Sequence, residues 1–324
     1  MEEWASAAFA ALRPIMSGYK PGLTKPHLVS DLPKGINRIR ALPEPQLGAL
    51  WDSIVVDERL KSQLLGQAVL NFTMREKVDR TALPLHGVIL LVGEPGTGKT
   101  SLARGLAHRT AEVFKGPNFR LLEVEPHTLA SSAMGKTQKA VSELFAQAVA
   151  EAASVGPTIV LLDEVETLAA DRAKMSLEAN PIDIHRATDA VLVQLDELAE
   201  RFTNLLFVAT SNFPQALDSA FISRADLVVE VPLPDKAAAA RILRECLEGI
   251  GKSYPSVGKL VHSPQFDRCA AELAGLDGRA IRKTVGNALG ARLEVAADPN
   301  KVQVDDLIAA AQQAKARRLA GGRH

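Results

Sequence analysis

The sequence predicts a three-layer α/β fold with a five-stranded parallel sheet, followed by a small α-helical domain. Up to residue 231, short segments rich in leucine or β-branched residues alternate with helical patterns, and beyond Pro234 the strand signal disappears. Strands that alternate with helices form parallel sheets covered by helices on both faces. The expected strands cover residues 88–92, 119–125, 158–163, 205–211 and 227–231.

The first 48 residues are expected to form an extended, proline-rich arm. They contain prolines at positions 14, 21, 26, 33, 43 and 45, and this spacing would interrupt most helices. Ordered structure is therefore expected to begin near Leu50, with a first helix over residues 60–78.

The rest of the chain is expected to form two domains. Helices over residues 137–153 and 183–198 complete the large domain, 49–233. The small domain, 234–324, is expected to contain helices over residues 237–249, 264–274, 279–295 and 304–319. Pro232 and Pro234 mark a hinge, and a ligand would bind in the cleft beside it, at the carboxyl ends of the strands.

Composition limits the function classes. With 38 basic and 38 acidic residues among 324, the net charge is zero, so no overall field attracts a polyanion and nucleic acid is an unfavoured partner. Cys246 and Cys269 lack metal-ligand spacing and are expected to be free, buried thiols. The start, Met1–Trp4, lacks signal-peptide features, and no apolar run has membrane-spanning length, so a cytoplasmic protein is expected.

A glycine-rich segment follows the first predicted strand and has the pattern of a phosphate-binding loop. Its glycines allow backbone N–H groups to turn toward an anion, and the helix that follows adds the positive end of its dipole. Lys99 can contact the β- and γ-phosphates, and the Thr100 hydroxyl can bind Mg²⁺. The expected nucleotide-binding residues of this loop are Gly93, Pro95, Gly96, Thr97, Gly98, Lys99, Thr100 and Ser101.

Two acids end the buried strand at residues 158–163. Asp163 is expected to complete the magnesium site with Thr100, and Glu164 to polarise the attacking water. The glycine pattern alone can arise by chance in a turn, and the acids could cap the next helix, although capping explains only one carboxylate. Both motifs together predict a nucleoside triphosphatase that uses Mg²⁺.

Three further residues resemble the AAA+ class of ATPases. Asn212 matches sensor one, beside the γ-phosphate, although Ser-Asn-Phe-Pro is also a reasonable turn. Arg224 matches the arginine finger that reaches a neighbouring subunit; its alternative is a salt bridge to Asp226. Arg279 resembles sensor two, with Arg282 one helical turn later as the competing assignment. The resemblance implies oligomerisation, most simply a hexameric ring.

Several segments resemble one AAA+ branch in particular, the pachytene checkpoint ATPases that remodel HORMA-domain proteins. The resemblance implies ATP-driven unfolding or switching of a HORMA protein through the ring's pore. The short arm resembles bacterial members from antiphage (CBASS) systems, where the ATPase would separate a HORMA protein from a cyclic-oligonucleotide synthase. The segments are residues 50–54, 161–168, 180–183, 190–196, 210–212, 221–226 and 278–279.

The pore loop departs from that family. Relatives place an aromatic residue after the strand ending at Glu125, whereas this chain has Ala133 and Met134 in the matching stretch. Met134 can grip a threaded chain weakly, or it can belong to the core. A second polar loop over residues 172–180 is another candidate pore lining.

Two rival functions remain open at this point. A loader or other motor acting on nucleic-acid complexes would show DNA-stimulated, salt-sensitive behaviour, which zero net charge and the lack of an added DNA-binding module disfavour. A nucleotide-dependent scaffold would bind ATP without hydrolysing it, but such a protein has no need of the water-polarising acid Glu164.

Overall fold

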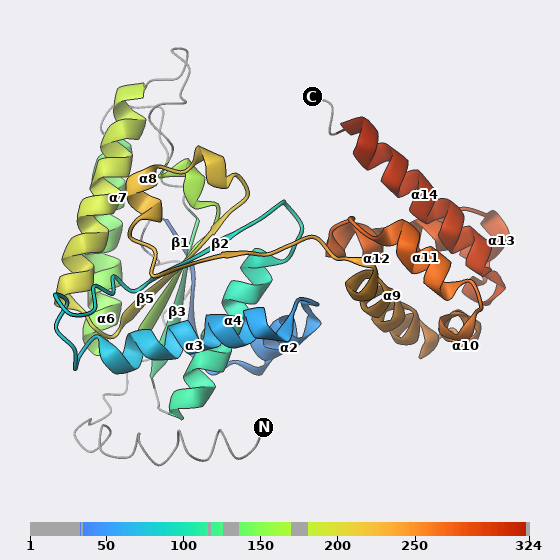
Figure 1. Cartoon of the computed structure of the whole chain (residues 1–324), viewed down its shortest axis with the longest axis horizontal. Helices are drawn as coiled ribbons and strands as arrows, with labels where there is room; N and C mark the ends of the chain where they lie inside the picture. The colour runs from blue at the N-terminus through green and yellow to red at the C-terminus, as the bar shows by residue number, and fades with distance from the viewer. Residues whose placement is uncertain (1–32, 34, 116–117, 126–135, 170–180, 322–324) are drawn as a thin grey trace. The chain divides into compact units, whose positions relative to one another are not determined.

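The computed structural model describes residues 33, 35–115, 118–125, 136–169 and 181–321 (Figure 1). Ala133, Met134 and the loop over residues 172–180 lie outside these residues, so their role in substrate binding stays a prediction. In the described part of the chain, no helix combines the length and apolar character that crossing a membrane requires.

A six-stranded sheet forms the centre of the large domain. The five strands that the sequence predicts are present and run parallel to one another. A sixth strand, β1, pairs antiparallel with β3, so the sheet is mixed rather than purely parallel. In the order β1-β3-β4-β5-β2-β6, the strands are Ile36–Leu42, Phe119–Val124, Thr158–Leu162, Leu205–Ser211, Val88–Val92 and Leu227–Glu230.

Strand β1 and helix α2 (Pro45–Ser53) correct the last part of the prediction that residues 1–48 form an extended arm, because they begin at Ile36 and Pro45, before Leu50. The first 32 residues of that range lie outside the described residues. Two of the prolines that suggest an arm lie where elements begin and end: Pro43 follows β1, and Pro45 occupies the first turn of α2. Proline is tolerated in a first helical turn because its missing N–H would have no partner there.

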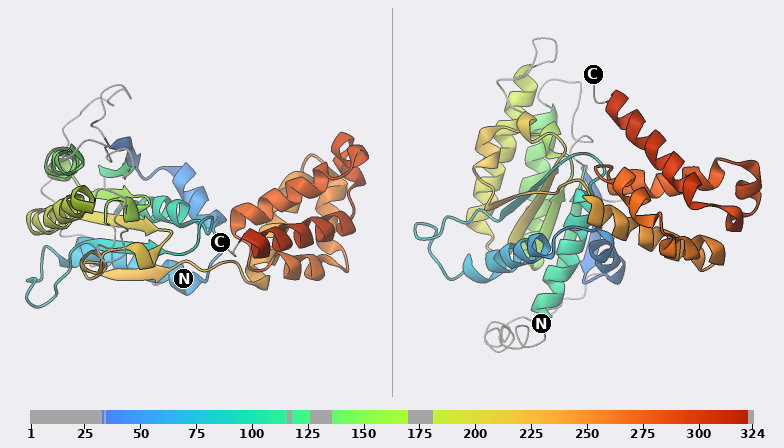
Figure 2. Two further views of the ribbon diagram at one scale, coloured as in Figure 1. Left: turned by 90° about the horizontal axis from the view of Figure 1, so that it is seen from above. Right: turned by 45° about the vertical axis from the view of Figure 1, so that its right-hand side comes forward.

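Helices cover both faces of the sheet, as expected (Figures 1 and 2). Helices α2, α3 (Glu58–Met74) and α4 (Lys99–Phe114) pack with the sheet in one buried cluster that includes Leu102 and Ile89. On the other face Phe145 lies against Phe207 of β5, with 5.9 Å between ring centroids. The segments on that face are α5 (Lys136–Glu143), a π-helical turn (Leu144–Val149), α6 (Ala150–Val155) and α7 (Pro181–Arg201).

The small domain has its own core, which includes the buried thiol of Cys269. Both cysteines are free, as predicted, although Cys246 is only half-buried. The expected helix over residues 279–295 is interrupted, because Arg292 is extended and starts a new short helix. The helices are α9 (Lys236–Gly251), α10 (Pro255–Lys259), α11 (Phe266–Leu273), α12 (Gly278–Gly290), α13 (Leu293–Ala297) and α14 (Val304–Gly321).

Candidate active site

The loop between β2 and α4 contains positive φ angles that residues with a side chain rarely adopt. Gly96 and Gly98 have φ angles of +82° and +95°. A Cβ at Gly96 would lie 2.4 Å from a carboxylate oxygen of Asp277, and one at Gly98 would lie 2.5 Å from Cδ1 of Ile54. The loop therefore combines a left-handed backbone with tight packing and leads directly into the N-terminus of α4, an arrangement that suits an anion.

Lys99 lies at the start of α4 and is 5% exposed. Its Nζ donates hydrogen bonds to the carbonyl oxygens of Gly93, at 2.9 Å, and Glu94, at 2.8 Å. Burial lowers the pKa of Lys99, whereas neighbouring carboxylates, Glu166 and Asp163 first among them, raise it. The ammonium group is thus held inside the loop by oxygen atoms and balanced by nearby acids.

Asp163 is the point where three elements meet. Its Oδ1 accepts hydrogen bonds from the hydroxyl of Thr100, at 2.7 Å, and from the hydroxyl of Thr210, at 2.6 Å. Thr100 comes from α4, Asp163 follows β4, and Thr210 lies in β5. The predicted magnesium ligands Thr100 and Asp163 are therefore in direct contact, and hydroxyl and carboxylate oxygens are ligands that Mg²⁺ prefers.

Glu164 has an unusual backbone that its neighbours stabilise. Its φ is +55°, in the left-handed region that few residues other than glycine adopt. The Glu164 N–H donates to the Thr210 hydroxyl at 3.0 Å, and the Asn212 side-chain amide donates to Oε1 of Glu164 at 3.1 Å. The Asn212 backbone N–H donates in turn to Glu166, also at 3.1 Å. Asn212 is thus tied to both acids of this turn.

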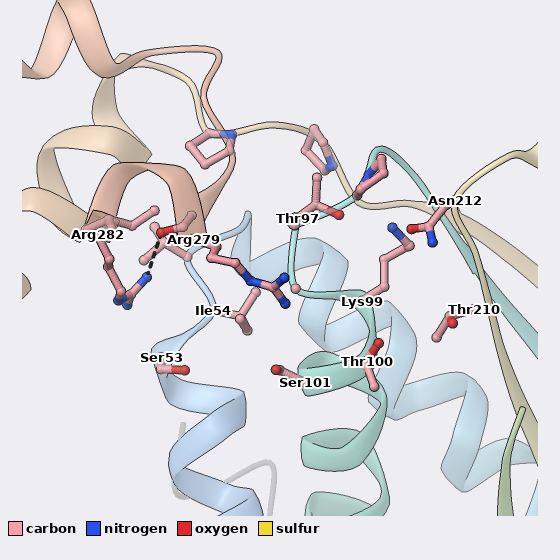
Figure 3. Close-up of a pocket in the computed structure, with 18 of the residues that line it drawn as sticks. Ser53, Ile54, Thr97, Lys99, Thr100, Ser101, Thr210, Asn212, Arg279 and Arg282 are labelled. Atoms are coloured by element: carbon pink, nitrogen blue, oxygen red, sulfur yellow. Dashed lines mark hydrogen bonds between the residues drawn. The ribbon is translucent and has the colours of Figure 1, made fainter. Parts of the chain in front are cut away.

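These groups surround one cavity of about 600 Å³ (Figure 3). One side carries the phosphate-binding loop and the acids Asp163 and Glu164. Another side is largely apolar, which suits the nucleoside part of a ligand. The apolar lining residues are Ile54, Val55, Pro232, Pro234 and Ile242; those predicted for nucleotide chemistry are Pro95, Gly96, Thr97, Gly98, Lys99, Thr100, Ser101, Asp163, Glu164, Asn212 and Arg279.

The two competing arginines of α12 differ in direction. Both residues line the cavity, but Arg279 points toward the phosphate-binding loop, whereas Arg282 points away from it and donates to the carbonyl oxygen of Gly278 (Figure 3). Arg282 also lies 3.7 Å from a carboxylate oxygen of Glu245. The geometry therefore favours Arg279 over Arg282 for contact with a ligand in the cavity.

Arg224 does not line this cavity. It follows the short helix α8 (Ser219–Ile222) and pairs with Asp196 of α7, so the alternative of a salt bridge to Asp226 is wrong. The Asp226 carboxylate instead accepts from three backbone N–H groups at the start of β2: His86, Gly87 and Val88, at 2.7–3.1 Å. Arg224 therefore lies outside the nucleotide cavity of its own chain.

Some residues of the site were not predicted individually. The sequence indicates Thr210 only as part of Thr210-Ser211-Asn212, and its contact with Asp163 depends on the alignment of β5 beside β4. The apolar residues Ile54 and Ile242 have no local signal, because an isoleucine within a helix or at its end is equally typical of a core. Only the assembled fold brings them beside the phosphate-binding loop.

Comparison with known proteins agrees with this geometry. Residues 89–233 match the model of the ATPase family associated with various cellular activities (AAA). The chain is 69% identical over 294 residues to CD-NTase-associated protein 6 of Pseudomonas aeruginosa, covering 91% of this chain and 97% of the relative. It is 36% identical over 228 residues to a Pachytene checkpoint protein 2 homolog of Oryza sativa subsp. indica, covering 69% of this chain but 47% of that relative.

Solved structures give the same picture of the fold. The structure of C. elegans PCH-2 matches with a TM-score of 0.70 at 26% identity, covering 90% of this chain and 77% of that one. The HORMA:CdnC:Trip13 complex of E. coli MS115-1 includes a chain that matches with a TM-score of 0.66 at 20% identity, covering 85% and 94%. The chain belongs to the AAA ATPases and, within them, to the pachytene checkpoint family that includes CD-NTase-associated protein 6.

Proposed function

We propose that this protein binds ATP with Mg²⁺ and hydrolyses it as a homo-hexameric ring in order to remodel a HORMA-domain protein. The remodelling would separate the HORMA protein from a cyclic-oligonucleotide synthase and so reduce bacterial antiphage signalling. The observation that carries the proposal is the contact set around Asp163 and Glu164: two threonine hydroxyls on the first acid and the Asn212 amide on the second.

The residues present fit a metal-bound triphosphate. Thr100 and Asp163 would hold Mg²⁺, which would neutralise phosphate charge and orient the transferred group. Magnesium commonly takes one or two protein ligands and completes its shell with phosphate oxygens and water, so this pair is sufficient. Lys99 and the loop N–H groups would bind the phosphates.

Four residues of the chain would act at the γ-phosphate, each in a different role. Glu164 would accept a hydrogen bond from the attacking water and polarise it, and Asn212 would orient that water and the Glu164 carboxylate. Arg279 would contact the γ-phosphate from α12 and so couple the small domain to the presence of ATP. Arg224 would place a guanidinium on the γ-phosphate in the neighbouring subunit.

The partners follow from the relatives' names. The curated relative is named for its association with a CD-NTase, and the solved complex contains a HORMA protein, CdnC and Trip13. High identity over nearly the full length of the first relative supports extending that partnership to this chain. We therefore propose a HORMA protein as substrate and a cyclic-oligonucleotide synthase as the protein from which it is released.

Disassembly of a purified complex tests the proposal. A HORMA protein and a cyclic-oligonucleotide synthase from the same genome are assembled, mixed with this ATPase, and followed by size-exclusion chromatography. We expect ATP to release the synthase, and neither a non-hydrolysable analogue nor the Glu164→Gln variant to do so. A complex that stays intact while ATP is hydrolysed would contradict the proposal, and DNA-stimulated hydrolysis would favour the nucleic-acid motor instead.

A further inference from the structure

The Arg224 side chain is fixed in its own subunit by three hydrogen bonds. Nε and one terminal nitrogen donate to the two carboxylate oxygens of Asp196, at 2.9 and 2.7 Å. The other terminal nitrogen donates to the carbonyl oxygen of Ala220, at 2.8 Å. The arginine is thus bound side-on by a carboxylate, with both partners coming from the large domain.

This arrangement leaves part of the guanidinium for another ligand. Arginine has five N–H donors, and three of them have the partners just described. Each terminal nitrogen keeps one N–H with no partner among the residues that the structure describes. Asp196 binds the side-on edge of the guanidinium, which is formed by Nε and one terminal nitrogen. An anion can therefore approach the end-on edge, formed by the two terminal nitrogens, without displacing Asp196.

The backbone around Arg224 is anchored separately from its side chain. Asp218 caps α8 by accepting from the N–H of Ala220 at 2.9 Å, and Asp226 fastens the other end of the segment to the start of β2. Neither contact fixes the direction of the long arginine side chain. Asp196, 28 residues earlier on α7, is the carboxylate that contacts the guanidinium itself.

The electrostatics of the pair agree with a persistent contact. The hydrogen bond from Arg224 lowers the pKa of Asp196, and the hydrogen bond to Asp196 raises the pKa of Arg224. Both groups therefore stay charged at neutral pH. The Asp196 side chain is 39% exposed and that of Arg224 is 24% exposed, so solvent weakens the attraction and the pair acts mainly through its geometry.

We propose that Asp196 is a positioning residue for Arg224, holding the guanidinium side-on so that its end-on edge faces the γ-phosphate bound by the neighbouring subunit. The inference rests on the proposed role of Arg224 in trans. Without Asp196 the side chain would sample other rotamers, and the contact with the transferring phosphate would form less often. A fixed donor costs little reorganisation during reaction, so loss of Asp196 reduces turnover rather than ATP affinity.

Mixed rings test where Asp196 acts. One type of subunit carries Arg224→Ala and keeps Glu164. The other type carries Glu164→Gln and keeps Arg224. Mixing them should restore hydrolysis at the interfaces where an intact finger meets an intact acid. Asp196→Ala is then added to either subunit type, with ATP binding measured in each variant to verify folding.

We expect the effect to follow the subunit that supplies the finger. Asp196→Ala in the Glu164→Gln subunit should lower the restored turnover about 10- to 100-fold at unchanged ATP affinity. In the Arg224→Ala subunit it should change nothing. Asp196→Asn, which keeps one oxygen acceptor, should recover part of the rate. Glu197→Ala is the matched control, because among the described residues this neighbouring acid accepts a side-chain hydrogen bond from Gln194 of its own helix and not from Arg224, and it should leave turnover unchanged.

Two results would overturn the inference, and they differ. If mixed rings regain activity equally with and without Asp196 in the finger-supplying subunit, Asp196 does not position Arg224, although Arg224 still acts in trans. If Arg224→Ala and Glu164→Gln subunits never complement each other in rings that assemble, Arg224 has no role in trans, and the inference about Asp196 fails with it.

Discussion

Thr210 organises both acids of the site from a fully buried position. It is 1% exposed, donates to Asp163 and accepts from the backbone N–H of Glu164. The second contact stabilises the left-handed backbone that directs the Glu164 carboxylate toward Asn212. A single hydroxyl therefore links the predicted magnesium ligand to the predicted water-polarising acid.

Replacing Thr210 with valine should slow hydrolysis more than it weakens binding. The substitution keeps the shape but removes the hydroxyl, so the Glu164 N–H loses its partner. We expect turnover to fall about 10- to 100-fold, as for other residues that orient metal ligands, and the ATP Kd to change less than about threefold. Steady-state hydrolysis and equilibrium titration with a fluorescent ATP analogue measure the two quantities. Thr210→Ser keeps the hydroxyl and should restore most of the rate; a fully active Thr210→Val variant would show that the contact is dispensable.

The two thiols should differ in reactivity in the folded protein. Burial raises the pKa of Cys269 to about 11 and also raises the pKa of the half-buried Cys246. Only the thiolate reacts, so at pH 8 little of Cys269 is in the reactive form. We expect Cys246 to be alkylated first and Cys269 to react on unfolding, with mass spectrometry of the labelled peptides as the measurement. Faster labelling of Cys269 would contradict its place in the small-domain core.

At the scale of the element, strand β1 depends on a charged cluster. Glu123 of β3 accepts from Arg40 of β1 at 2.7 Å and from Arg104 of α4 at 2.7 Å, while Arg40 also contacts Glu44. The Glu123 side chain is almost fully buried. Removing it would leave two arginines without their shared acid.

Glu123→Ala should therefore destabilise the large domain by about 3 kcal/mol, because breaking a buried ion pair leaves uncompensated charge. Glu44→Ala is the matched control: its contact is more exposed, and we expect a loss below about 1 kcal/mol. Urea unfolding followed by the fluorescence of Trp51, which lies in the core of the large domain, measures both. Equal losses in the two variants would mean that burial of Glu123 contributes nothing.

Helix α12 provides a second test at this scale. Arg279 points toward the phosphate-binding loop, whereas Arg282 points away from it and contacts Glu245 and Gly278. We expect Arg279→Ala to lower turnover about tenfold or more, since it removes a charge aimed at the ligand, and Arg282→Ala to stay within about twofold of wild type. Hydrolysis rates at saturating ATP measure both effects. A larger loss of turnover in Arg282→Ala than in Arg279→Ala would assign the sensor role to Arg282 instead.

The sequence predicts the elements with strong local signals and misses those defined by tertiary contacts. The five parallel strands are near-continuous apolar runs and were all found. Strand β1 has no clean alternation, because its register with β3 shifts between Ile36 and Arg38 and Ile39 is exposed. Likewise, Asp196 lies far from Arg224 in sequence, and only the packing of α7 beside α8 brings them together.

At the scale of the whole molecule, strand β2 connects the phosphate-binding loop to the segment that carries Arg224. Strand β2 ends at the phosphate-binding loop of its own subunit, and its start is bonded to Asp226, two residues beyond the proposed finger Arg224. In the proposed ring, β2 would therefore link the phosphate-binding loop of one subunit to the segment that carries the proposed finger for the next subunit.

The most direct test of the account is the Glu164→Gln variant, assayed for ATP binding and for single-turnover hydrolysis. We expect its ATP Kd to stay within about twofold of wild type and its hydrolysis rate to fall about 100- to 10,000-fold, because general-base assistance is lost while the phosphate contacts remain. Glu151→Gln, an exposed acid on α6, is the control and should leave both values unchanged. A Glu164→Gln protein that hydrolyses ATP at the wild-type rate would contradict the account.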